Sequence, residues 1–184
     1  MALKLITAPT EEPIALNDVK GYLRIDGTDF DALLTGLIKA AREYCEAFQN
    51  RAYVTQTWEM SLDAFPDLPL KLPKPPLQSV VSVKYTDQNG VESVFAPSNY
   101  LVDPVSEPGR LAFAYGKSWP SVTLQPVNAV KIQFVAGYGA AAAVPQAVKT
   151  AMMLYIAHRF ENPDGDDVPE AVHSLLWAER VVPV

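Results

Sequence analysis

The stretch LRIDGTDFDALL, residues 23–34, places Asp26, Asp29 and Asp31 within six positions of one another. Three carboxylates at this spacing could bind a divalent cation. A calcium loop of the EF-hand type, however, requires a glycine at its sixth position and a bidentate glutamate at its twelfth. Counted from Asp26, the glycine is second and the twelfth residue is Leu37. The spacing therefore does not predict a calcium site.

The same stretch has the features of a helix start. We expect Thr28 to be the N-cap, and Asp31, three residues later, resembles the acidic partner of a capping box. Asp29 and Asp31 would lie in the first turn, where the helix dipole favours negative charge. These carboxylates are therefore expected to act on stability.

A second acidic cluster contains Glu161, Asp164, Asp166 and Asp167, and lies between His158 and His173. His158 and Glu161 are three positions apart, so both could face one metal ion on a helix. No third ligand follows at helical spacing, and the segment has the composition of a solvated turn between helices. We expect His158 to be a partly buried helix residue, and keep a small metal-dependent enzyme using His158 and Glu161 as an alternative.

Other residue types that carry chemistry are isolated. Cys45, the only cysteine, lies on an apolar helix face, and we expect a small core residue. No GxSxG, HExxH, P-loop or GxGxxG motif is present. Lys71 and Lys74 alternate with prolines and apolar residues and are expected to form a solvated edge, with contact to passing DNA as the alternative. The sequence thus predicts no enzyme, no cofactor and no metal site.

The elements that must position these residues form three blocks. Residues 1–52 are expected to be the first part of a helical core, because apolar residues recur with a 3.6-residue period from about Asp29 to Gln49. Residues 53–139 alternate and are rich in β-branched and aromatic residues, which predicts an inserted antiparallel β-sheet or barrel lobe. The prolines between 66 and 76 break up strand pairing, so an extended connector is expected there. Asn89-Gly90 predicts a hairpin within the lobe, and 107–109 a turn. Residues 140–184 return to helix, with two helices that begin after Pro145 and near Pro169. The predicted fold class is α+β.

Composition restricts the function further. The chain has 184 residues, with 15 Lys and Arg against 21 Asp and Glu, a formal net charge of −6. This charge argues against a protein whose affinity depends on neutralising phosphates over its whole surface. The N-terminus does not resemble a signal peptide, and no apolar run approaches 18 residues, so we expect no membrane span. The expected compartment is the cytoplasm.

Six ordered segments, spanning about residues 5–178, closely resemble the head–tail connector (adaptor) proteins of long-tailed bacteriophages and prophages, in the branch that carries a β-rich insertion. The resemblance implies a structural virion protein at the head–tail junction that forms a ring, expected to be twelvefold, beneath the portal protein after DNA packaging. Such a ring extends the channel through which DNA passes without sequence-specific binding, and offers a surface to stopper or tail proteins. A stopper or tail-terminator ring is the alternative. The segments are LNDVKGYLRIDGTDFDALLTGLIKAAREYCEAF, TQTWEMSLDAFP, LPKPPLQSVVSVKYTDQNGVES, NYLVDPVSEPGRL, AVKIQFVAGYG and VPQAVKTAMMLYIAHRFENP.

The C-terminal residues are the candidate contact site. Trp177 lies off the apolar stripe of the last helix, and the residues after it have no evident partner within the chain. Connectors of the family reach the portal with their C-terminal segments, which implies contact with the portal or a neighbouring subunit here. Aromatic residues and arginine dominate such interfaces. The candidate residues are Trp177, Arg180, Val181, Val182 and Val184.

Overall fold

The computed structural model describes residues 1–165 and 167–182, and these residues form two compact units. The helical unit consists of Thr10–Val54 and Tyr138–Val184, and the sheet unit of Met1–Pro9 and Thr55–Gly137. The expected insertion at 53–139 corresponds to most of the sheet unit. Residues 1–9, however, were expected in the helical part and belong to the sheet unit instead.

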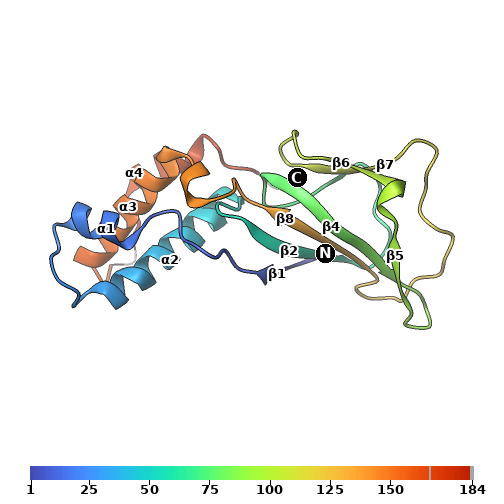
Figure 1. The fold of residues 1–184 in the computed structure, drawn as a ribbon, viewed down its shortest axis with the longest axis horizontal. Helices are drawn as coiled ribbons and strands as arrows, with labels where there is room; N and C mark the ends of the chain where they lie inside the picture. The colour runs from blue at the N-terminus through green and yellow to red at the C-terminus, as the bar shows by residue number, and fades with distance from the viewer. Residues whose placement is uncertain (166, 183–184) are drawn as a thin grey trace. The chain divides into compact units, whose positions relative to one another are not determined.

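The helical unit contains four α-helices, whose bounds agree closely with the periodicity of the sequence (Figure 1). Pro145 and Pro169 immediately precede the third and fourth helices. Proline is favoured at a helix start because the N–H that it lacks would have no acceptor within the helix. A short 3₁₀ helix, Ala141–Ala143, leads into the third. The helices are α1 (Leu16–Leu23), α2 (Asp31–Gln49), α3 (Gln146–Glu161) and α4 (Glu170–Trp177).

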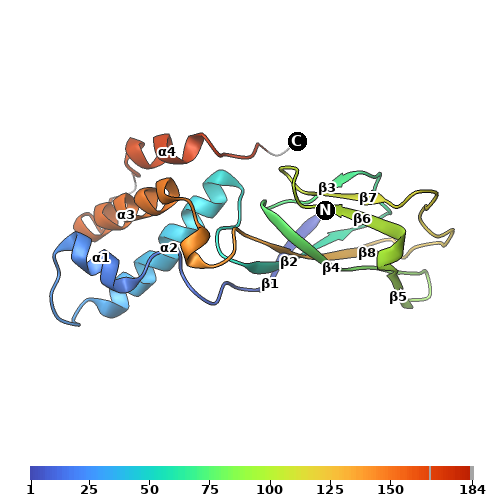
Figure 2. The ribbon, with the colours of Figure 1, turned by 45° about the horizontal axis from the view of Figure 1, so that its top comes forward.

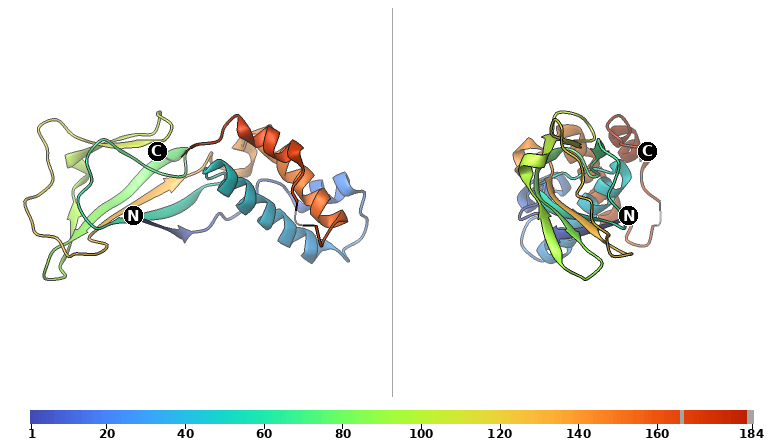
Figure 3. Two further views of the ribbon diagram at one scale, coloured as in Figure 1. Left: turned by 180° about the vertical axis from the view of Figure 1, so that it is seen from behind. Right: turned by 90° about the vertical axis from the view of Figure 1, so that its right-hand side faces the viewer.

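One apolar core joins the two parts of this unit that are far apart in the sequence. α2 and α3 run side by side, as Figure 3 shows from behind, and α4 packs against both. The prediction that the first and last blocks pack together is therefore confirmed. Cys45 is fully buried in this core, and burial raises the pKa of its thiol to about 12. The fully buried members include Val19, Leu34, Ala41, Cys45, Tyr53, Ala151, Met152, Ile156, Val172 and Leu176.

The start of α2 differs from the prediction. Its N-cap is Phe30, and no side chain caps it. The carbonyl of Thr28, not its hydroxyl, accepts a hydrogen bond from the backbone N–H of Asp31. The Asp31 carboxylate instead lies 2.7 Å from Lys20 Nζ, which ties α2 to α1. Thr28 as N-cap was therefore wrong, because the helix begins at Asp31, after an N-cap at Phe30, and the Asp31 carboxylate pairs with Lys20 instead.

The sheet unit is built on a five-stranded antiparallel sheet in the order β1-β2-β8-β4-β5. Along β2 and β8, alternate residues such as Met60 and Ile132 are fully buried on one face. The opposite face is polar, with Glu59 opposite Gln133 and Lys4. The strands are β1 (Ala2–Thr7), β2 (Gln56–Leu62), β4 (Leu77–Thr86), β5 (Glu92–Phe95) and β8 (Val130–Ala136).

A smaller antiparallel sheet, in the order β3-β7-β6, lies over one face of the larger sheet (Figure 2). β3 (Leu70–Lys71) lies inside the proline-rich segment, where we predicted no strand. The turn at 107–109 joins β6 (Tyr100–Asp103) to β7 (Arg110–Phe113), as predicted. Gly109 is required in this turn, because a Cβ there would overlap the Leu77 side chain.

Trp119 is the aromatic centre of the sheet unit. Its ring stacks on Phe65 at a centroid distance of 4.8 Å and contacts Phe95 and Phe113. Its indole N–H donates to the carbonyl of Pro66 over 2.8 Å, which holds the proline-rich segment in place. Trp119 therefore joins the aromatic cluster of the sheet unit to the proline-rich segment.

The predicted hairpin at residues 87–90 joins β4 to β5. Gly90 has a φ of +80°, which glycine adopts without strain. The Asp87 carboxylate accepts the backbone N–H groups of Asn89 and Val91 at 2.8 and 2.9 Å, so these bonds lower its pKa. Within the described part of the chain, no helix is long and apolar enough to cross a membrane.

Candidate partner-binding surface

The C-terminal end of α2 is built to hold another chain segment. Asn50 ends the helix in the left-handed conformation, with a φ of 55°. Asn50 Nδ2 donates to the carbonyl of Val181 over 2.8 Å, and the Val181 N–H donates to the carbonyl of Gln49 over 2.9 Å. The residues that follow α4 are therefore bound to the end of α2.

Gln49 links this segment to the core. It is 1% exposed, and its Nε2 donates to the carbonyl of Leu176 over 2.7 Å. Its Oε1 accepts the hydroxyl of buried Tyr53, also over 2.7 Å. Arg51 Nε donates to the carbonyl of Glu179. Because an unsatisfied buried amide is costly, these bonds fix the path of the chain beyond α4.

A buried ionic network supports the same face of this helix. Arg42 is 4% exposed and lies 2.7 Å from Glu12 and 3.0 Å from Glu46. Glu46 also accepts the backbone N–H of Tyr53 over 2.8 Å. Burial acts to lower the pKa of Arg42, but the hydrogen bonds and charges of Glu12 and Glu46 outweigh it, so the pKa is raised. Arg42 is therefore held charged and fully paired.

The exposed part of this region is aromatic and cationic. Trp177 is 63% exposed, and its ring lies 6.3 Å from Phe48. The Arg180 guanidinium lies 5.0 Å from the Phe48 ring centroid and 5.2 Å from that of Trp177, within cation–π range. Arg180 Nε also donates to the carbonyl of Phe48 over 3.0 Å. We call Trp177, Arg180 and Val182 the C-terminal surface.

The candidate residues of the sequence thus divide into two groups. Trp177, Arg180 and Val182 are exposed, and Val182 is 70% exposed. Arg180 and Val181 were expected to have no partner in the chain, which is wrong. Arg180 bonds to the carbonyl of Phe48, and both backbone groups of Val181 bond to the end of α2. Val184 lies outside the described residues.

The two histidines that flank the second acidic cluster have different partners. His158 Nε2 lies 3.8 Å from Asp167 Oδ1, whereas His173 Nε2 lies 2.7 Å from the Tyr44 hydroxyl in an aromatic stack. Among the residues that the structure describes, no three His, Cys, Asp or Glu side chains group around a point that could hold a metal ion. This statement covers Asp26, Asp29 and Asp31, but Asp166 lies outside it.

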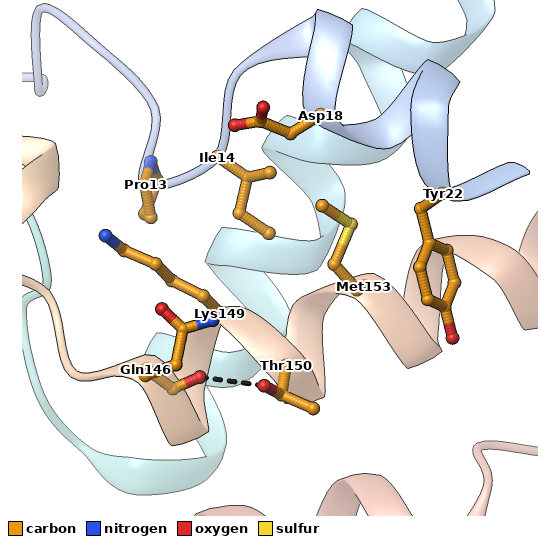
Figure 4. A pocket seen from close by; sticks show the side chains of 8 residues that line it. All are labelled: Pro13, Ile14, Asp18, Tyr22, Gln146, Lys149, Thr150 and Met153. Atoms are coloured by element: carbon orange, nitrogen blue, oxygen red, sulfur yellow. Dashed lines mark hydrogen bonds between the residues drawn. The ribbon is translucent and has the colours of Figure 1, made fainter.

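A pocket of about 440 Å³ opens between α1 and α3 (Figure 4). Asp18 and Lys149 are its charged residues, and they form no ion pair with each other. Thr150 Oγ1 donates to the carbonyl of Gln146 over 2.9 Å, so its hydroxyl is not activated by a base. The lining contains no nucleophile with a base beside it and gives no support to the enzyme alternative. It is formed by Pro13, Ile14, Asp18, Tyr22, Gln146, Lys149, Thr150 and Met153.

Comparison with known proteins identifies the family. The family model described as "Head completion protein" matches residues 12–164. The chain belongs to the head completion protein family. No curated protein matches it.

Solved structures are similar to this head completion protein over its whole length. A chain from the virion of a native gene transfer agent particle is 25% identical, with a TM-score of 0.82. A chain from the neck of a native gene transfer agent particle, computed with C12 symmetry, is 26% identical, with a TM-score of 0.78. Each alignment covers 100% of this chain and 97% of the other. The predicted α+β fold and the resemblance to phage connector proteins are confirmed.

The polar residues that shape this surface were not predicted from the sequence, although a signal was present. Arg42, Glu46 and Gln49 occupy positions four and three residues apart on the same side of α2 as the apolar stripe. Polar residues on the core face of an amphipathic helix indicate a buried network, because each must find a partner there.

Proposed function

We propose that this head completion protein is a head–tail connector, a structural protein that forms a ring on the portal protein after DNA packaging. The ring extends the DNA channel and offers the surface to which stopper or tail proteins attach. The observation that carries the proposal is the match over 100% of the chain to a chain in a particle neck computed with C12 symmetry. That symmetry supports the expectation of a twelvefold ring.

The C-terminal surface is the proposed contact with the portal or with the neighbouring subunit that faces it. Trp177 is 63% exposed and Val182 70% exposed, while the hydrogen bonds of Val181 and Gln49 hold the backbone between them. A preformed surface loses little conformational freedom on binding, which favours affinity. Trp and Arg are the side chains that most often dominate such contacts.

The DNA channel is proposed to be acidic or of mixed charge. DNA must slide through a connector, and a lining of unpaired lysines would retain its phosphates. In the sheet unit, Lys84 and Lys131 both pair with Glu92, at 2.7 and 3.4 Å, and Arg110 pairs with Asp103 at 2.7 Å. The helical unit carries fourteen acidic against eight basic residues. This balance supports passage of DNA without retention.

The direct test is to mix the purified protein with its cognate portal and image the product by electron microscopy. We expect a ring of this protein on one end of the portal. The variant Trp177→Ser/Val182→Ser should reduce ring occupancy, and Tyr115→Ser, which removes an exposed aromatic side chain from the sheet unit, should not. Unchanged far-ultraviolet circular dichroism would show that both variants fold.

Two outcomes would contradict parts of the proposal. A ring that joins tails but never binds the portal would indicate a stopper or tail terminator instead. Normal portal binding by Trp177→Ser/Val182→Ser would leave the connector function intact and place the portal contact elsewhere on the chain.

A further inference from the structure

The opposite end of the helical unit has an exposed apolar patch of its own. Phe30, at the start of α2, is 45% exposed, and Leu33, one turn later, is 52% exposed. The Phe30 ring packs edge-to-face on Phe160 at a centroid distance of 5.4 Å, so its position is fixed by the end of α3. Two large apolar side chains are thus presented to solvent on a rigid support.

Carboxylates surround this patch and remain unneutralised. Asp26 and Asp29 precede Phe30, whereas Glu161 and Asp164 follow Phe160, and all four are exposed. None of the four makes an ion pair with any residue that the structure describes. We call Phe30, Leu33 and these four carboxylates the end patch.

Three cations lie near these carboxylates in the sequence, and Arg24, the one closest to Asp26, is exposed and makes no ion pair with any of the four. The other two are engaged elsewhere. Lys20 pairs with Asp31, and Arg159 donates to the carbonyl of Gly165 and lies 5.4 Å from the Tyr155 ring centroid. The charge of the end patch is therefore available to a partner.

The end patch is separate from the C-terminal surface. α2 has 19 residues and so is about 28 Å long. Phe30 and Leu33 lie at the start of α2, whereas Arg180 of the C-terminal surface bonds to Phe48 in its last turn. A protein that stands between two neighbours needs two contact surfaces, and the two ends of this helix supply them.

We propose that the end patch binds a basic segment of a second neck protein, one that presents an apolar side chain flanked by lysine or arginine. This proposal rests on the connector function, and it assigns the end patch to the component that joins after the ring has formed, on the tail side. Charge complementarity steers such an encounter, and burial of Phe30 and Leu33 stabilises the complex.

Charge excludes the other occupants. Duplex DNA is repelled by unpaired carboxylates. A second end patch from another copy would place like charges opposite each other, which is unfavourable. The sheet unit has seven acidic and seven basic residues, so it offers no excess of positive charge to a neighbouring copy. The remaining class is a different protein with a basic surface.

The test uses DNA-filled heads that lack this protein. The heads are incubated with native protein or a variant, sedimented, and assayed for bound protein; purified tails are then added and joined particles are counted. The test variant is Asp29→Lys/Leu33→Gln. The matched control, Asp67→Lys/Val91→Gln, makes the same charge change and a similar apolar-to-Gln change at two exposed positions of the sheet unit, where Val91 is 57% exposed. Asp164→Lys, in the turn after α3, is a second test variant that leaves α2 unchanged.

We expect both test variants to bind heads as the native protein does, but to reduce joining to tails by about tenfold, which corresponds to about 1.4 kcal/mol. Joining by the native protein should weaken as salt is raised, because exposed charges are screened. Normal joining by both test variants would overturn the proposal. So would a loss of head binding by folded test variants, because the end patch would then face the head. If native protein and control also fail to bind heads, the connector function itself is contradicted.

Discussion

The two units take up about half of the chain each, but one is acidic and the other has no net charge. The helical unit carries fourteen acidic and eight basic residues, which is the whole net charge of −6, whereas the sheet unit carries seven of each. Conversely, eleven of the sixteen exposed large apolar side chains found in the described residues belong to the sheet unit. The helical unit is therefore suited to electrostatic selection of partners, and the sheet unit to apolar contact.

The interiors of the two units also differ in their content of charged residues. The buried charged residues of the described chain, Arg42, Glu46 and Arg51, all lie in the helical unit. The sheet unit is instead centred on Trp119 and the phenylalanine rings around it. A buried hydrogen-bonded network requires each polar group to keep its partner, whereas an apolar core requires its volume to stay filled. The two units should consequently respond differently to substitution.

The largest effect is expected at Arg42. Arg42→Leu removes the guanidinium that lies 3.0 Å from buried Glu46, and the free energy of unfolding should fall by about 3–5 kcal/mol. Urea unfolding followed by helical circular dichroism measures this loss. Lys39→Leu, on the same helix at a side chain that is 65% exposed, should change stability by less than about 0.5 kcal/mol. Equal effects of the two variants would show that the network does not stabilise the helical unit.

Glycine substitutions should have opposite signs in the two units. Gly109→Ala forces a Cβ into the Leu77 side chain and should destabilise the sheet unit by about 1–3 kcal/mol. Gly36→Ala, in the middle of α2 where a Cβ meets nothing within 4 Å, should stabilise the helical unit by about 0.4–1 kcal/mol. Thermal unfolding of both variants tests the pair, and a common sign would contradict the packing described for one of them.

Acid should act first on the sheet unit. Hydrogen bonds from Ser106 and Arg110 hold the pKa of Asp103 below its usual value, and hydrogen bonding to Lys84 lowers the pKa of Glu92. Because both pKa values are lower in the folded state, the stabilisation is complete above about pH 4.5 and is lost as pH falls through the folded values.

The measurement is tryptophan fluorescence during thermal unfolding, in a Trp177→Ser background. The two remaining tryptophans, Trp58 and Trp119, then both report on the sheet unit. The Tm should decline below about pH 4, and Asp103→Asn should reduce that decline. A Tm that is constant down to about pH 3 would contradict the assignment.

The smallest effect is expected at Thr28. Only its carbonyl is used at the start of α2, so Thr28→Ala should change stability by less than about 0.5 kcal/mol. The N-cap predicted from the sequence would instead have contributed about 1 kcal/mol. Urea unfolding distinguishes the two values. Added calcium should leave the Tm unchanged, and a calcium-dependent rise would show that Asp26, Asp29 and Asp31 bind the ion after all.

Local patterns account for most of what the sequence predicted. The apolar period of α2 and the Asn89-Gly90 turn depend on neighbours within a few residues, and both were recognised. β1 was missed because six residues with a single lysine give too short a pattern, and β3 because prolines surround it. The contacts of Val181 with Gln49 and Asn50 join positions about 130 residues apart, so no local pattern encodes them. Trp177 and Arg180 were predicted as contact residues from the position of Trp177 off the apolar stripe, from their types and from the family resemblance. Whether they contact the portal stays a prediction.

The buried thiol of Cys45 can report when the helical unit unfolds locally. A thiolate is the reactive form of cysteine, and with a pKa of about 12 and no exposed surface this one is withheld from alkylating reagents. Its modification rate in the native chain therefore counts how often the helical unit opens, with no engineered label. Comparison of that rate before and after binding to heads would measure how strongly docking stabilises the helical unit against local unfolding.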